Sequence, residues 1–247
     1  MLYQLITGKH LSHIVTYQYR RNMHDKSKQN QQLGKDVNEY LEKMGVQTPL
    51  TELVDMETSK KLELVEKDIF NTLTTLGLDL SDDSLVDTPK RVAKMYVNEI
   101  FSGLRDDTFP KCTAVENKMC HGDEFVLEKN ITLYSDCEHH LRPIIGRAHI
   151  AYIPKEKVLG LSKMNRLVHY FARRPQIQER LCQQIAHAMA FITESDDIIV
   201  AIDAAHTCVS QRGVMDSNST TSTITALGAF GEKGSSLRQE FTSACNT

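Results

Sequence analysis

The sequence predicts an α+β fold in which an antiparallel sheet carries two helices on one face. Two observations support this prediction. The elements expected over residues 111–247 run in the order strands, two helices, strands, and residues 36–106 before them show helical periodicity. Segregation of strands and helices along a chain is typical of α+β folds. We therefore expect a flexible extension over 1–35, a helical region over 36–110 and a sheet-containing domain over 111–247.

The extension is predicted from its composition. Arg, Lys, Gln, Asn and His dominate residues 17–35, which leaves few side chains to bury. A segment of this kind gains little from packing, so we expect it to be mobile. Met23, within this segment, is an alternative start of the chain.

Two helices are expected between residues 36 and 106. Apolar residues at spacings of three and four predict one helix face, and they are Leu62, Val65, Ile69, Leu73 and Leu76. Gly77 is a plausible end of this helix. Thr88 is the expected N-cap of the second helix, with Pro89 at its first position, and this helix should end near Gly103.

The strands are predicted from β-branched residues. They are concentrated over residues 125–133 and 144–153, which we expect to form two strands. Residues 198–209 and 219–230 return to the same character and should complete the sheet.

Two helices are expected between these strand pairs. Ser162 should cap the first, which runs to about Arg173, and Pro175 should begin the second. Periodicity directs one face of the second helix toward the core, and this face comprises Ile177, Leu181, Ile185, Ala188 and Ile192.

The composition narrows the class of protein. Hydrophobic residues make up 40% and charged residues 25%, which is ordinary for a globular protein, and the net charge of −3 does not favour a nucleic-acid partner. No apolar run approaches the roughly 20 residues of a membrane helix, and the N-terminus lacks signal-peptide features. We expect a cytoplasmic protein whose six cysteines are thiols or metal ligands. The pair Cys120-His121 is interpreted as part of a loop, not as a site.

A metal site is predicted from three residues. Two residues separate Cys137 from His140, so both can reach one ion from a tight turn, and Cys208 lies at the end of an apolar strand. Two thiolates and one imidazole suit zinc, and three protein ligands leave a fourth position for water. His206 lies two residues before Cys208, on the same face if the strand continues. A closed structural site, with His206 as fourth ligand, is the alternative. In the open site, His139 and His206 are candidate proton-transfer groups.

An anion site is predicted at the helix that follows Gly160. Exposed backbone N–H groups make a helix start favourable for phosphate. Leu161, Ser162 and Lys163 open this helix, and Arg166 lies one turn further on. Together with Arg212 and Arg91 they could bind a triphosphate, although for each residue alone a solvated surface position is the favoured interpretation. Gln178 and Glu179 begin the next helix, where a carboxylate can accept two N–H bonds from guanine or simply favour the helix dipole.

Several motifs in order resemble those of one family. They are Ser135–His140, Ala151–Lys155, Gly160–Arg166, Arg174–Arg180 and Cys208–Gly213, with Thr88–Tyr96 and Glu99–Gly103 upstream. Over roughly residues 38–245 the chain resembles the GTP cyclohydrolase I family. The resemblance implies a tunnelling fold, a ring-shaped homodecamer with active sites between subunits, and conversion of GTP to 7,8-dihydroneopterin triphosphate and formate. That reaction is the first step of tetrahydrofolate and pterin biosynthesis.

The resemblance also implies residue roles. By it, Cys137, His140 and Cys208 hold Zn²⁺, His139 and His206 transfer protons, and Glu179 holds the guanine edge with Gln178 beside it. Leu161, Ser162, Lys163, Arg166, Arg212 and Arg91 match the helix start and the triphosphate or ribose contacts. Ser210 departs from the pattern, because relatives often carry a basic residue there.

Two alternatives remain open. One is another tunnelling-fold enzyme that acts on a pterin or deazaguanine, against which the pairing of Cys137 with Cys208 argues. The other is a non-catalytic, zinc-stabilised subunit of the same ring. Retention of His139, His206 and Glu179 argues against a binding module, which does not need proton-transfer groups.

Overall fold

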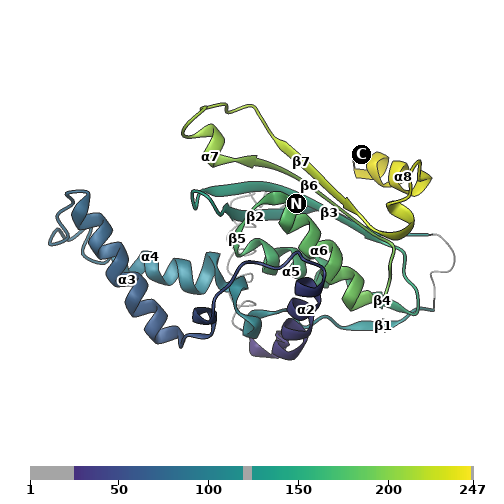
Figure 1. Cartoon of the computed structure of the whole chain (residues 1–247), viewed down its shortest axis with the longest axis horizontal. Coiled ribbons are helices and arrows are strands. Elements are labelled where there is room, and N and C mark those ends of the chain that lie inside the picture. The colour runs from purple at the N-terminus through teal and green to yellow at the C-terminus, as the bar shows by residue number, and fades with distance from the viewer. Residues whose placement is uncertain (1–24, 119–123, 246–247) are drawn as a thin grey trace, which may run out of the picture.

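The computed structural model describes residues 25–118 and 124–245 and has a mixed α+β architecture (Figure 1). Among these residues, one sheet has the strand order β5-β2-β3-β6-β7. The strands are β2 (Val126–Cys137), β3 (Pro143–Tyr152), β5 (Pro175–Gln176), β6 (Ile198–His206) and β7 (Thr221–Ala226). The short β5 runs parallel to β2, and the other neighbours are antiparallel. The antiparallel pairing thus brings the end of β2, the start of β3 and the end of β6 together at one end of the strands.

Helices α5 (Leu161–Ala172) and α6 (Gln178–Thr193) cover one face of the sheet. Alternate residues of the strands, such as Ile150 and Val200, join their apolar side chains in the main core. The opposite face of the sheet packs against α8 (Ser236–Cys245), whose Phe241 is buried with Ile199 in a smaller cluster. Residues alternate between these two clusters because successive side chains of a strand point to opposite faces.

A separate two-stranded ribbon pairs β1 (Ala114–Glu116) with β4 (Lys157–Leu159). The N-terminal part of the described chain contains α2 (Gln31–Lys43), α3 (Thr58–Thr75) and α4 (Thr88–Met95). The remaining helical elements are the four-residue α7 (Thr207–Ser210), a π-helical turn at Tyr96–Ile100, and 3-10 turns at Lys26–Lys28, Glu52–Asp55, Ser102–Leu104, Asp106–Thr108 and Gly228–Phe230.

Helices α3 and α4 project away from the sheet as an arm (Figure 1). Helix α3 has no buried residue, even though it carries the predicted apolar face. Leu64 and Phe70 are among its exposed side chains, and Leu76 directly after the helix is 73% exposed. The helix ends as expected before Gly77, whose φ of +87° is a conformation that favours glycine.

The predicted strands are present, but several predicted boundaries are wrong. Gly160, not Ser162, occupies the N-cap of α5, and Asp87, not Thr88, that of α4. Pro175 does not begin α6, because it pairs with Asp136 in β5, and α6 starts at Gln178. These errors arise because proline and small polar residues also suit strand ends and second helix positions.

The strand expected over 198–209 ends at His206, since the chain turns there into α7. The strand expected over 219–230 is limited to β7. Helix α8 was not predicted. The boundary placed at residue 35 falls inside α2, which begins at Gln31 and buries Gly34.

Two interpretations fall on residues that the structure does not describe. Met23 as an alternative start and Cys120-His121 as a loop both lie outside the described ranges. Within those ranges, Cys112, Cys137, Cys182, Cys208 and Cys245 are free thiols. No helix in the described ranges combines the length and apolar character needed to cross a bilayer.

Candidate active site

A tight turn after β2 positions the first two predicted metal ligands. Cys137 is the last residue of β2, and its carbonyl accepts hydrogen bonds from the backbone N–H groups of His140 and Leu141 at 3.4 and 2.8 Å. Leu141 has a φ of +49°, a left-handed conformation that reverses the chain. The turn therefore presents Cys137 and His140 on the same side, as the spacing of two intervening residues predicted.

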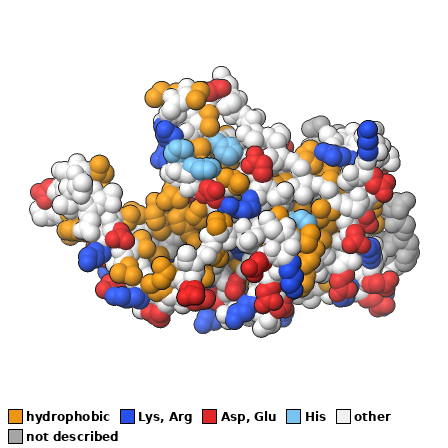
Figure 2. Space-filling model, in the orientation of Figure 1, with side chains coloured by type: hydrophobic (Ala, Val, Ile, Leu, Met, Phe, Trp, Pro, Cys, Tyr) orange, Lys and Arg blue, Asp and Glu red, His pale blue; other side chains and the backbone are white. Residues whose placement is uncertain are grey.

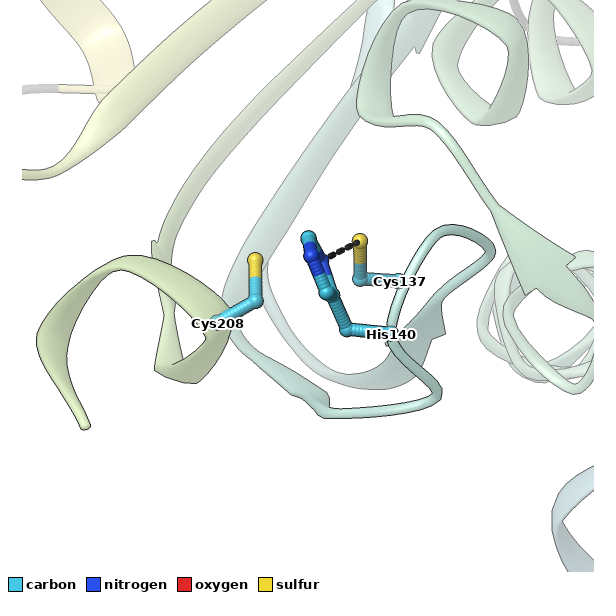
Figure 3. Close-up of side chains that lie close together, drawn as sticks. All are labelled: Cys137, His140 and Cys208. Carbon is cyan, nitrogen blue, oxygen red and sulfur yellow. Dashed lines mark hydrogen bonds between the residues drawn. The ribbon is translucent and has the colours of Figure 1, made fainter. Parts of the chain in front are cut away.

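Cys208 approaches the same site from α7 (Thr207–Ser210), the short helix that directly follows β6. The pairing of Ile144 with His206 holds the end of β6 against the start of β3, close to the turn after Cys137. Cys208 follows on α7, not on a strand, so the prediction that it shares a strand face with His206 is wrong. The helical turn nevertheless directs its sulfur toward His140 (Figure 3).

The three side chains form a group that could hold a metal ion. One ligand atom from each of Cys137, His140 and Cys208 lies within 4.8 Å of the others, and Cys137 Sγ is 4.0 Å from His140 Nδ1 (Figure 3). Ligand atoms around a tetrahedral zinc are separated by about 3.5–3.8 Å, given Zn–S and Zn–N bonds of about 2.3 and 2.0 Å. Small side-chain movements would bring this group to that spacing, and its S₂N donor set suits zinc.

The environment of the two thiols also fits a cation. Burial and the neighbouring Cys137 sulfur raise the pKa of Cys208, because a second negative charge beside a thiolate is unfavourable. A divalent cation between the sulfurs would reverse this effect, since metal ligation stabilises the thiolate form.

Arg212 contacts the imidazole of His140. Its guanidinium donates to His140 Nε2 across 2.7 Å. A guanidinium has no acceptor, so Nε2 carries the lone pair and Nδ1 the proton in this arrangement. Ligation of a metal through Nδ1 would require this bond to break, which would release Arg212 for an anion. Arg212 is therefore the one predicted phosphate contact, among the described residues, that touches a predicted metal ligand.

Two further histidines lie beside the metal-ligand group. His139 is exposed, with its Nδ1 3.7 Å from Cys137 Sγ. His206 is half-buried, and burial lowers its pKa, which the nearby Glu179 carboxylate partly opposes. A space-filling view shows histidine side chains gathered at this end of the molecule, next to Lys and Arg side chains (Figure 2).

Gln178 is a buried partner of His206. Its Oε1 lies 2.8 Å from His206 Nε2, and the side chain is only 2% exposed. Its Nε2 donates to the carbonyls of Ile202 and Thr221 at 2.9 and 2.8 Å and approaches Thr223 Oγ1 at 3.1 Å. The amide is thus occupied by protein groups, whereas the neighbouring Glu179 is exposed and acts electrostatically on His206. Sequence reasoning grouped both residues as substrate contacts and could not separate their environments.

The structure adds two residues that sequence reasoning missed. Glu138, inside the metal turn, forms an ion pair with Arg180 of α6, and both side chains are largely buried. Arg180 also donates to Gln176 Oε1 at 3.3 Å, and Glu138 N donates to the Gln176 carbonyl at 3.0 Å. The turn that carries Cys137 and His140 is therefore fastened to the start of α6. Their presence in the motifs Ser135–His140 and Arg174–Arg180 was the only sequence signal.

The predicted anion contacts on α5 lie away from the metal-ligand group. Asn165, in the first turns of α5, donates to Glu128 at 3.1 Å, and Glu128 precedes Cys137 by nine residues along β2. At about 3.3 Å per strand residue, this separation is roughly 25–30 Å. Leu161, Ser162, Lys163 and Arg166 share this distant end of α5. An extended nucleoside triphosphate is shorter, so it cannot span both groups of one chain.

Arg91 belongs to neither group. It lies on α4, in the projecting arm, where it pairs with Asp87 across 3.2 Å with both side chains exposed. Ser210 is the last residue of α7, next to Gln211, whose side chain accepts a hydrogen bond from Arg142. A serine at position 210, where relatives often carry a basic residue, therefore leaves the geometry of the metal-ligand group intact.

Comparison with known proteins identifies the family of this chain. Residues 65–246 match the family model described as GTP cyclohydrolase I. The chain is 53% identical over 206 residues to the GTP cyclohydrolase 1 of Photobacterium profundum, covering 83% of this chain and 93% of that protein. It is 52% identical over 205 residues to that of Vibrio cholerae and 50% identical over 207 residues to that of Aliivibrio salmonicida, with similar coverage. This chain belongs to the GTP cyclohydrolase I family.

Proposed function

We propose that this chain converts GTP to 7,8-dihydroneopterin triphosphate with release of formate, the first step of pterin and tetrahydrofolate biosynthesis. Membership of the GTP cyclohydrolase I family supports an enzyme that acts on GTP. The observation that carries the proposal is the convergence of Cys137, His140 and Cys208, with His139 and His206 beside them. A purely structural metal site would not need the two additional imidazoles.

Zinc is the proposed metal, held by Cys137, His140 and Cys208. The donor set and the ligand spacing support it, and three protein ligands leave one position open. When bound there, zinc would act as a Lewis acid that lowers the pKa of water toward neutral pH, so that it can attack C8 of the guanine. His206 is proposed to transfer protons and not to close the coordination sphere, because among the described residues the converging ligand atoms are those of Cys137, His140 and Cys208.

The two histidines have different environments and therefore different proposed tasks. His206 stays neutral near pH 7 because burial lowers its pKa, so it is suited to accept a proton from a reacting group. Its Nε2–H donates to Gln178, which leaves Nδ1 as the basic nitrogen. His139 is exposed and close to Cys137, and it is suited to exchange protons between the reacting atoms and solvent. Together they can serve the two hydrolytic steps that ring opening and formate release require.

Glu179 is proposed to bind the guanine edge. It is an exposed residue in the first turn of α6, and its carboxylate is near enough to His206 to raise the pKa of that imidazole. A carboxylate can accept parallel hydrogen bonds from N1–H and the exocyclic amine of guanine, a pattern that adenine lacks. This contact would place C8 toward the metal-ligand group.

We further propose the tunnelling fold and ring-shaped homodecamer of this family. Among the described residues, β7 and β5 are the outer strands of the sheet, and β5 covers only the last two residues of β2. Open strand edges are available to pair with another copy of the chain. The exposed apolar side chains of α3 also favour burial against a partner.

We also propose a division of the chain into a helical region over 36–110 and a sheet domain over 111–247. A cytoplasmic location is proposed as well, and the free thiols of the described residues support it.

In such a ring the active site would combine two chains. The roughly 25–30 Å of β2 between Glu128 and Cys137 keeps Ser162, Lys163 and Arg166 from the metal-ligand group of their own chain. We propose that these residues bind the triphosphate of a GTP whose guanine lies at the metal-ligand group of a neighbouring chain. Arg212 would add a phosphate contact from the metal side, and Arg91 one from a projecting arm.

The test is incubation of zinc-loaded protein with GTP, with formate and an oxidised, fluorescent pterin as readouts. We expect both products, and their loss in the presence of a chelator. Formate without pterin would show ring opening without the later rearrangement. Neither product, with zinc bound, would favour the second candidate, a non-catalytic zinc-stabilised ring subunit. Turnover of a pterin or deazaguanine instead of GTP would favour another tunnelling-fold enzyme.

A further inference from the structure

A basic groove lies along α5, at a distance from the metal-ligand group. Its volume is about 380 Å³, and its floor is formed by one face of α5, a face that begins at Ser162 and continues to Arg173 directly after the helix. The other walls come from the turns at residues 102–108 and from residues 26–29, near the N-terminus of the described chain. Five cationic side chains line it, namely Lys26, Lys28, Arg105, Arg166 and Arg173.

The N-terminal wall is held in place by backbone contacts. Asn30 N donates to the Phe109 carbonyl at 2.9 Å, Lys111 N donates to the Lys28 carbonyl at 2.8 Å, and Gln29 forms an antiparallel bridge with Pro110. Lys26 and Lys28 are therefore carried by a 3-10 turn, and the backbone contacts of residues 28–30 hold this turn on the groove wall. This segment lies in the range that composition alone assigned to a mobile extension.

The opposite wall is also tightly built. Gly103 N donates to the Arg173 carbonyl at 3.0 Å, and a side chain at Gly103 would collide with the Tyr170 carbonyl. Thr108 Oγ1 donates to the Ser102 carbonyl at 2.8 Å. The groove is therefore a preformed feature, and its binding of a ligand would not require the walls to be ordered first.

The charge of the groove is strongly positive. Asp107 is the only acidic residue among its lining residues, and it pairs with Arg105 at 3.3 Å. Lys28 pairs with Asp25 at 3.4 Å, whereas Lys26 and Arg166 form no ion pair among the described residues. His169 adds no charge near pH 7, because burial and the nearby Arg173 lower its pKa to about 4. A concave surface with this excess of cations concentrates anions.

We propose that Lys26 and Lys28 bind the polyphosphate chain of the nucleoside triphosphate in this groove, together with Ser162 and Arg166. The inference rests on the proposed function, which assigns Ser162 and Arg166 to the triphosphate, and it extends that subsite to the N-terminal segment. The ligand chemistry is that of a linear polyphosphate, because the groove offers cationic side chains from both walls and from the floor. The segment at residues 25–30 is thus a substrate-binding wall.

The test compares two double variants of the full-length, zinc-loaded protein. Lys26→Ala/Lys28→Ala removes the wall charges, and Lys43→Ala/Lys233→Ala removes two exposed lysines outside the groove as a matched control. Steady-state kinetics gives kcat and KM for GTP, and calorimetry gives the Kd of inorganic triphosphate. Circular dichroism and thermal unfolding verify that both variants fold like the wild type.

We expect the wall variant to raise KM roughly tenfold with kcat little changed, as loss of charge-assisted phosphate contacts predicts. The Kd of triphosphate should rise in parallel, and triphosphate should compete with GTP. Unchanged KM and Kd in the wall variant would overturn the inference. Triphosphate that binds in the groove without competing with GTP would also overturn it, since the groove would then serve a separate anion. If the wild type releases no formate, the proposed function fails, and the Kd comparison still tests the wall.

Discussion

The side-chain oxygen of Gln178 lies 2.8 Å from Nε2 of His206 and fixes the orientation of that imidazole. Gln178 can do so because its own amide nitrogen is held by β6 and β7, through the carbonyls of Ile202 and Thr221. The hydrogen bond places the His206 proton on Nε2 and leaves Nδ1 as the acceptor. A residue first interpreted as a substrate contact thus acts on a proposed proton-transfer group.

Replacement of Gln178 by Met should therefore lower kcat more than it raises KM. We expect kcat to fall about 10- to 100-fold, part of the 10²–10⁴ that a positioned proton-transfer group contributes. Zinc content should be unchanged in this variant.

Gln184→Met is a matched control for this change. Gln184 is also fully buried on α6 and hydrogen-bonded, but to Gln176, Val46 and Thr48, not to His206. Both Met variants should lose stability, by about 1–3 kcal/mol for each buried polar group left unsatisfied. Equal losses of kcat in the two variants would show that Gln178 acts only through stability.

Cys208→Ser should remove zinc and activity together. A serine hydroxyl is a poor zinc ligand, and the two remaining ligands hold the ion weakly. Cys245→Ser is the control, because Cys245 is a half-buried thiol outside the group. Metal analysis of the purified proteins gives the zinc content, and formate release gives the activity. Full zinc occupancy in Cys208→Ser would contradict the ligand assignment.

The ion pair between Glu138 and Arg180 should support the metal turn. Arg180→Met leaves Glu138 partly buried without its partner and loosens the turn that carries Cys137 and His140. We expect zinc affinity to fall about 10- to 100-fold, the usual effect of losing an outer-shell partner. Competition with a chromogenic chelator measures it. Lys157→Met, which breaks an exposed ion pair with Glu194, should leave zinc affinity unchanged, and an equal loss there would refute the specific role.

The metal-ligand group could be predicted from sequence, and the reason is chemical. Cysteine and histidine are few, and the separation of Cys137 from His140 by two residues places both on one turn whatever the rest of the fold. Cys208 was found as well, but its helical turn was not, because a four-residue helix such as α7 has no periodicity to detect. The turn with Cys137 and His140 was thus local information, whereas its meeting with Cys208 depended on the pairing of β3 with β6.

Other features depend on contacts between distant parts of the chain. Gln178 and Glu179 are adjacent in sequence, yet only the packing of α6 on the sheet makes the first a buried partner of His206. Likewise, the polar composition of residues 17–35 predicted mobility, but hydrogen bonds to Phe109 and Lys111 order its last part. Composition indicates how much apolar surface a segment can bury, but it does not indicate which of its backbone groups will form hydrogen bonds with distant residues.

Acid should destabilise the protein partly through His169. Its pKa is lowered to about 4 in the folded state, against about 6.5 when unfolded, because burial and Arg173 disfavour the charged imidazole. The unfolded chain therefore binds the extra proton first as pH falls from about 6.5 to 4, and folding stability is lost across that window. The full contribution is at most about 3.5 kcal/mol, from about 1.4 kcal/mol per pKa unit.

His169→Gln should reduce this acid sensitivity, since its amide can still donate to the Thr132 carbonyl that His169 contacts at 3.1 Å. Urea unfolding at pH 7 and pH 4.5 gives the change in free energy for wild type and variant. The variant should show the smaller loss between the two pH values. An equal loss in both proteins would mean that other groups, such as His149, whose pKa burial also lowers, dominate the acid response.

Two variants that each impair one half of the site should restore activity to each other, at a GTP concentration well below the KM of Arg166→Ala, if the active site combines two chains. Cys208→Ser lacks a metal ligand, and Arg166→Ala lacks an anion contact at the distant end of α5. In a co-expressed ring with both variants in equal amounts, about one site in four would receive both intact halves, because each half is drawn independently in a symmetric assembly. We expect about a quarter of wild-type formate release.

Restoration requires that the triphosphate and the guanine of one GTP contact different chains. Each variant chain lacks either Cys208 or Arg166, so neither chain alone can form a complete site. Activity no higher than that of the separate variants, in rings shown by tagged purification to contain both, would place the whole site in a single chain and contradict the separation that β2 imposes.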